Sequence, residues 1–163
     1  MPSTQIDPWH DLFMMAGSAS AALVGLLFVA VSLNHEQILK MPTLPELAGV
    51  SITLLIGVTV LSVAGLTPGQ NRVALGVELL VVGVAVTVIT FALVLTRLRH
   101  LTHRSWRVTR LALTAASTLP ALVCGATLVV GVGGGLYWAA LEIVAALVTA
   151  TYNAWVLLIE IRR

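Results

Sequence analysis

The sequence predicts an all-α, polytopic membrane protein with five transmembrane helices. Hydrophobic residues make up 58% of the 163 residues, charged residues make up only 10%, and the mean hydropathy is +1.00. A soluble domain of this size cannot bury that much apolar surface. Apolar stretches of the roughly 20 residues needed to cross a bilayer core recur along the chain. We therefore expect a single transmembrane domain over residues 1–163.

The boundaries of the five spans follow from the residues that interrupt the apolar stretches. A Pro-containing linker, KMPTLPE, separates the first two spans, and the turn TPGQN precedes the third. A basic segment follows the third span, and Pro120 near the middle of the fourth is expected to kink it. The glycine tract GVGGG then separates two stretches that are each long enough to cross, which favours a hairpin over a re-entrant element. The expected spans cover residues of about 12–34, 47–67, 73–96, 110–131 and 136–160.

The basic segment RLRHLTHRSWRVTR, residues 97–110, predicts the orientation of the chain. With five crossings, it shares one side of the membrane with the linker at 35–46 and with the C-terminus. That side holds every Lys and Arg residue except Arg72. Basic residues that flank membrane spans concentrate on the cytoplasmic side. We therefore expect the N-terminus outside and the C-terminus in the cytoplasm.

The same segment predicts contacts with lipid headgroups. Each basic residue near a membrane surface attracts anionic lipid by roughly 1 kcal/mol. Nucleic-acid binding is not expected, because the segment has a single Trp and no platform on which bases could stack. The expected headgroup contacts are Arg97, Arg99, Arg104, Arg107 and Arg110.

The sequence predicts neither a cofactor nor catalytic chemistry. It has no Cys-x-x-Cys-His haem attachment motif, and GVGGG lacks the Lys-Ser/Thr that follows a phosphate-binding loop. His100 and His103 are three residues apart and share a predicted side with His35 and Glu36, which leaves a metal site as an alternative. Solvated loop histidines are commoner, so we expect no metal site.

Three acidic residues lie near the outer ends of the predicted spans: Asp11, Glu78 and Glu142. The two glutamates lie about 9 Å inside their helices, at 1.5 Å per residue. A carboxylate that faces lipid is costly, so each should face protein, a partner subunit or water. One interpretation is an acidic outer mouth of a cation pathway. The alternative is that the side chains reach the interface, where the helix N-termini favour negative charge.

Two polar stripes run along the predicted helices. In the first span a polar residue or glycine recurs at every seventh position from Asp11 to Ser32, and in the fifth span polar residues follow one face from Glu142 to Glu160. The stripes predict a hydrated pathway, although polar side chains can also simply hold helices together. The expected pathway residues are Asp11, Ser18, Ser32, Glu78, Glu142, Thr149 and Asn153, and the expected constriction is formed by Met14, Leu27 and Phe28.

Small residues in the first span, AGSASAALVG, predict close helix packing. Pairs such as Ala16 and Ser20 are four residues apart, a spacing that lets helix backbones approach each other in membranes. We expect this helix to be central, either beneath its four neighbours or around an oligomer axis. A homo-oligomer is favoured because a chain of 163 residues offers little room for a pathway of its own.

Residues 9–34, WHDLFMMAGSASAALVGLLFVAVSLN, resemble the first helix of a group of small bacterial membrane proteins of unassigned function. In that group a Trp and a Phe (W-x-x-x-F) precede a Gly/Ala-rich stretch that ends in GLLFVA and a polar cap. The resemblance covers about one sixth of the chain. It implies a multi-pass protein of the bacterial inner membrane and carries over no catalytic or binding residue.

Taken together, the stripes and the acidic residues predict a homo-oligomeric ion channel or pore that conducts cations. Its expected partners are membrane lipids and further copies of the same chain. The alternative is an accessory or regulatory subunit that packs against a larger membrane complex. A secondary transporter is less favoured, because five helices do not divide into two inverted halves.

Overall fold

The computed structural model describes residues 7–41, 44–98, 104–132 and 134–161, and within these ranges the chain is helical with no strand. The glycine tract separates the fourth span from the fifth, as expected. The elements are the 3-10 turn η1 (Asp7–Trp9), α1 (His10–Leu33), α2 (His35–Lys40), α3 (Leu44–Leu66), α4 (Arg72–Leu98), α5 (Arg104–Ala116), α6 (Leu119–Val130) and α7 (Leu136–Ile161).

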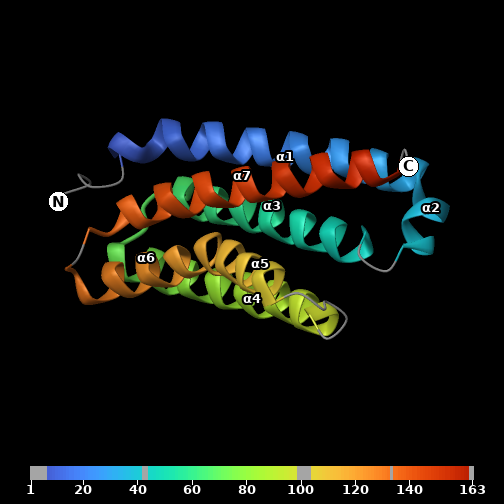
Figure 1. The fold of residues 1–163 in the computed structure, drawn as a ribbon. Coiled ribbons are helices and arrows are strands. Elements are labelled where there is room, and N and C mark those ends of the chain that lie inside the picture. The colour runs from blue at the N-terminus through green and yellow to red at the C-terminus, as the bar shows by residue number, and fades with distance from the viewer. Residues whose placement is uncertain (1–6, 42–43, 99–103, 133, 162–163) are drawn as a thin grey trace.

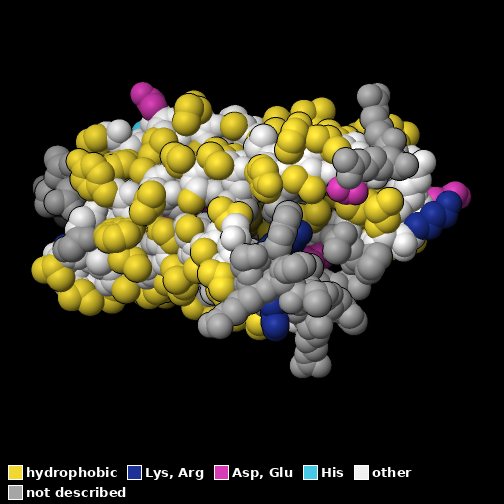
Figure 2. Space-filling model, in the orientation of Figure 1, with side chains coloured by type: hydrophobic (Ala, Val, Ile, Leu, Met, Phe, Trp, Pro, Cys, Tyr) yellow, Lys and Arg dark blue, Asp and Glu magenta, His cyan; other side chains and the backbone are white. Residues whose placement is uncertain are grey.

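Five helical segments are long and apolar enough to cross a membrane, which confirms the expected class of fold. Each has 23 to 25 residues. Apolar side chains cover the middle of the molecule, and the charged side chains visible in Figure 2 lie mostly in the half that holds α2 and the C-terminal end. The five segments are His10–Leu33, Leu44–Leu66, Arg72–Thr96, Arg107–Val130 and Leu136–Glu160.

The long helices form an antiparallel bundle with α3 at its centre (Figure 1). α3 packs against α1 on one side and α4 on another, and α7 also packs along it. α6 completes the bundle by packing against α4 and α7. α1 and α4 therefore lie on opposite sides of α3, at the top and bottom of Figure 1.

The expectation that the first helix lies beneath its four neighbours is wrong, because that place belongs to α3. In the most apolar 18-residue stretch of each helix, 61% of α3 is buried and only 22% of α1. Two glycines explain how α3 accepts neighbours so closely. A Cβ at Gly57 would lie 2.7 Å from a methyl group of Val86, and one at Gly65 would lie 2.7 Å from the ring of Phe13.

Pro120 breaks the fourth span instead of only kinking it. α5 ends at Ala116 and α6 begins at Leu119, with Pro120 in its first turn. A proline has no N–H to donate to the carbonyl four residues earlier, and its ring clashes with that carbonyl. That carbonyl belongs to Ala116. The break also changes the hydrogen bonds just before it: the Thr118 N–H donates to Ala115, and the carbonyl of Thr114 accepts instead from the buried hydroxyl groups of Ser117 and Thr118.

α4 and α6 cross closely through glycines on both helices. A Cβ at Gly125 would lie 2.8 Å from the carbonyl oxygen of Gly76, and one at Gly83 would lie 3.2 Å from the Cβ of Ala121. Small residues at such crossings let two backbones approach within van der Waals contact, which is how helices associate in lipid.

Candidate functional site

The polar stripe of the first span lies on the outward face of α1. Asp11, Ser18, Gly25 and Ser32 are all exposed along this helix, and a Cβ at Gly25 would meet no atom within 4 Å. We refer to these four residues as the α1 stripe. It extends from the first turn of α1 to its last and points away from the bundle.

Two of the three expected constriction residues share the exposed side of α1. Met14 and Phe28 are 53% and 54% exposed. Leu27 is only 6% exposed and belongs to the core cluster between the helices. The structure therefore separates Leu27 from the other two.

The polar residues of the fifth span lie inside the bundle. Glu142 is 2% exposed, and Thr149 and Asn153 are each 8% exposed. Their helix, α7, packs chiefly against α3 and α6. The α1 stripe points out of a protomer and the polar face of α7 points into it, so the two do not line one passage within a single copy.

Glu78 lies apart from the other two acidic residues. It is exposed on α4 and accepts a hydrogen bond of 2.6 Å from the side-chain nitrogen of Gln70. Since α4 and α1 lie on opposite sides of α3, Glu78 and Asp11 do not form a common mouth within one protomer. Glu142 is inside the bundle between them, so the structure does not bring these three carboxyl groups together.

Glu142 has an unusual environment for an acidic side chain. Its Oε2 atom is buried and has no hydrogen-bond partner among the described residues. The buried Cys124 of α6 lies near Glu142 and near the backbone of Ala139, one turn earlier on α7. Glu142 is therefore enclosed at the contact between α6 and α7.

The sequence did not single out the polar contact that joins α1 to α3. Ser20 is fully buried, and its hydroxyl oxygen lies 2.9 Å from that of Thr59. Each hydroxyl also lies within hydrogen-bond distance of a carbonyl of its own helix. Ser20 was part of the small-residue spacing in the first span, but its apolar neighbours gave no sign of which side of the helix faces protein.

Among the basic residues, Arg110 forms an ion pair within the protein. Its guanidinium donates to a carboxylate oxygen of Glu46 at 2.9 Å, which joins the start of α3 to α5. Arg107 is exposed. The side chains of Arg97 and Arg104 and all of Arg99 lie outside the described residues. Glu46 was not predicted, although it shares a predicted side of the membrane with Arg110.

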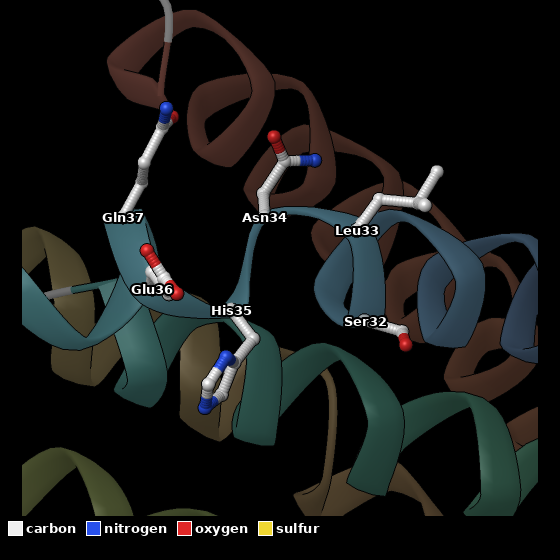
Figure 3. A pocket seen from close by; sticks show the side chains of 6 residues that line it. All are labelled: Ser32, Leu33, Asn34, His35, Glu36 and Gln37. Atoms are coloured by element: carbon white, nitrogen blue, oxygen red, sulfur yellow. The ribbon is translucent and has the colours of Figure 1, made fainter.

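The side chains that line the hollow at the junction of α1 and α2 do not point toward a common centre. It is lined by consecutive residues, Ser32 to Gln37. Figure 3 shows that Asn34 and Gln37 point to one side of the chain and His35 to the opposite side. Among the residues that the structure describes, no three His, Cys, Asp or Glu side chains are grouped to hold a metal ion. His100 and His103 lie outside those residues.

Aromatic side chains mark the other end of the bundle. The rings of Trp9 and Tyr137 meet edge to face, with their centroids 4.8 Å apart. This contact ties the start of α1 to the start of α7, as expected if both helices begin at the same membrane interface.

Comparison with known proteins adds no relative from which a function could be transferred. No protein-family model matches the chain, and no curated protein or solved structure matches it. The resemblance of residues 9–34 to a bacterial first helix stays a prediction.

Proposed function

We propose that the protein is a homo-oligomeric channel for cations, in which the α1 stripe of several copies faces a common passage. The observation that carries the proposal is the exposure of the whole stripe. In a single copy, Ser18, Gly25 and Ser32 would face lipid. The hydrocarbon of lipid offers no hydrogen-bond partner to hydroxyl or backbone groups. Around a shared axis the same groups would face water or the α1 helix of a neighbouring copy.

A passage between copies fits the packing of the bundle better than a passage through one copy. The described interior is filled by large side chains that are fully buried, among them Phe13, Leu54 and Ile143. The outward side of α1 carries exposed small residues such as Ala22 and Gly25 between larger apolar side chains. Small residues allow helices of adjacent copies to approach closely.

In this arrangement each residue of the stripe has a distinct role. The Asp11 carboxylate would attract cations at one mouth, because rings of acidic side chains select for positive ions. Ser18 and Ser32 are about 21 Å apart along the helix and would hydrate the passage. Met14 and Phe28, on the same side of α1, would narrow it. Glu142, Thr149 and Asn153 are left out of this passage.

The proposal includes the orientation and the compartment. We propose that the end carrying Lys40, Arg107 and Arg110 faces the cytoplasm of a bacterial inner membrane, and that Asp11 faces outside. The support is the concentration of basic residues near this end, since positive charge flanking membrane spans is retained on the cytoplasmic side. Arg107, which is exposed, remains a candidate for contact with anionic headgroups.

The effect of Asp11 on ion selectivity tests the proposal. Purified protein in planar bilayers is expected to carry cation-selective currents, and Asp11→Asn is expected to lower the cation-to-anion permeability ratio about fivefold. This corresponds to about 1 kcal/mol, the attraction between unit charges a few ångströms apart in water. The matched control is Glu78→Gln, which removes an exposed carboxylate on α4 and should leave selectivity unchanged.

Two results would contradict the channel. One is the absence of currents from protein whose helical content is intact, and the other is an equal loss of selectivity in both variants. The first would favour the second candidate function, an accessory subunit whose α1 receives a helix of a larger complex. The observation that favours this candidate is the same face of small and hydroxyl-bearing residues, which also suits a foreign helix. Purification in mild detergent distinguishes the two, because a stoichiometric foreign partner supports only the accessory subunit.

A further inference from the structure

Glu142 is a buried acidic side chain within a membrane-spanning helix. It lies six residues after Leu136, the first residue of α7, and so about 9 Å along the helix. Only 2% of its surface is exposed, and its buried Oε2 atom has no hydrogen-bond partner among the described residues. The other buried side-chain atoms without a hydrogen-bond partner among the described residues belong to hydroxyl or amide groups. Glu142 is therefore the acidic side chain in this set.

α6, which packs against the helix of Glu142, contributes no positive charge. It contains one titratable side chain, the buried Cys124, which lies near Glu142. On α7 itself, Tyr137 is 73% exposed at the start of the helix, and Tyr152 and Glu160 lie about three and five turns after Glu142. Neither helix supplies a cation that could balance a carboxylate at this position.

The other helices packed against α7 place their charged groups elsewhere. The titratable residue of α3, Glu46, is paired with Arg110 of α5 at the opposite end of the bundle. Arg107 of α5 is exposed at that same end. His10 and Asp11 of α1 lie nearer in depth, but both are exposed at the surface of the molecule.

Arg72 is the basic residue of α4 nearest the end of the bundle where Glu142 lies. Its guanidinium group is positioned over the backbone of Gly131, in the turn that follows α6, and the residue is exposed. α4 is not one of the helices that pack appreciably against α7. Arg72 therefore lies at the surface of this turn and not in the interior around Glu142.

A carboxylate without a counter-charge is costly in such a place. Transferring an ion from water to a protein interior costs several kilocalories per mole even after relaxation, and lipid around the bundle offers no water to offset it. A neutral carboxyl group avoids this cost. Its hydroxyl oxygen also becomes a hydrogen-bond donor, which suits a site lined by helix backbone and a thiol.

We propose that Glu142 is a proton-binding site, enclosed where α6 meets α7, and that its carboxyl group carries a proton at neutral pH. The ligand is a proton, exchanged with water at the nearer end of the bundle: release leaves the carboxylate and transfers the proton to a water molecule. Since the carboxylate would be unbalanced beside Cys124, proton release weakens the packing of α6 on α7. This site lies inside one copy and does not depend on conduction along α1.

Reaction with a hydrophobic carbodiimide tests the protonated state. Dicyclohexylcarbodiimide takes the proton of a neutral carboxyl group onto its nitrogen, and the carboxyl oxygen adds to its central carbon; the adduct then rearranges to a stable N-acylurea. We expect mass spectrometry of the full chain in lipid vesicles at neutral pH to find this adduct on the peptide that contains Glu142. The adduct should be lost in Glu142→Gln and retained in Glu78→Gln, in which an exposed carboxyl group on α4 is removed.

Infrared spectroscopy provides a second measurement that does not depend on access of the reagent. The spectrum of the wild-type protein minus that of Glu142→Gln should contain the carbonyl stretch of a protonated carboxyl group. Glu78→Gln should leave this carbonyl band in place. If Glu142→Gln removes carboxylate bands and the wild-type protein is not labelled, Glu142 is ionised and the proposal is overturned. Neither measurement uses ionic currents. A negative result would therefore contradict the proton site at Glu142 without contradicting the channel.

Discussion

Replacing Gly125 by alanine is expected to destabilise the bundle by about 3 kcal/mol, at the upper end of the cost of overpacking. The added Cβ would lie 2.6 Å from Leu80 Cγ, 2.8 Å from the Gly76 carbonyl oxygen and 2.8 Å from the Leu80 backbone nitrogen. Two of these atoms belong to the backbone of α4, so rotation of a side chain cannot relieve the clash. The two helices must separate. Unfolding of the purified protein, followed by circular dichroism, measures the loss.

Gly25→Ala is the matched control, because it makes the same chemical change within a transmembrane helix. A Cβ at Gly25 meets no atom within 4 Å. In the monomeric protein we expect no loss of stability, since alanine favours a helix more than glycine does and meets no neighbour at this position. Equal destabilisation by both alanines would show that the loss does not arise at the α4–α6 crossing, since alanine itself favours a helix more than glycine does.

Replacing Arg110 by alanine is expected to cost about 2 kcal/mol, somewhat below the usual cost of removing one partner of a buried ion pair. The side chain of Arg110 is 28% exposed and that of its partner Glu46 only 6%. Most of the destabilisation is therefore expected to come from removing the Arg110 charge beside the more deeply buried Glu46 carboxylate. Arg107→Ala removes an exposed guanidinium three residues earlier and should leave stability nearly unchanged. The same unfolding measurement compares the two variants.

A double-mutant cycle separates the ion pair from other contacts of these residues. Combining Arg110→Ala with Glu46→Gln should cost less than the sum of the two single changes, because the neutral amide no longer requires a counter-charge. Additive costs would mean that the 2.9 Å contact contributes no coupling energy.

The five spans were predictable because hydropathy and helix length suffice for them. Long apolar stretches must be helical in lipid, where every backbone polar group has to be satisfied within the segment. The turn residues and glycine tract then set the boundaries. Pro120 predicted a disturbance of the fourth span, but the extent of the break depends on the hydrogen bonds that the hydroxyl groups of Ser117 and Thr118 make just before it.

The faces of the helices were much less predictable. In water an apolar stripe identifies the buried side of a helix, but in a membrane both protein and lipid accept apolar side chains. Ser18 on α1 is exposed, whereas Thr149 on α7 is buried, although both lie in similar apolar sequences. For the same reason the composition of the first span did not reveal that α3 holds the centre. Which polar stripe faces inward is decided by contacts between helices distant in sequence.

The central position of α3 has a consequence for biosynthesis. α3 is the second span to leave the ribosome, yet α7, which covers part of it, is the fifth. Until α7 arrives, the side of α3 that it covers must be shielded by lipid or by the insertion machinery. A nascent chain arrested before α7 would therefore leave this face of α3 uncovered.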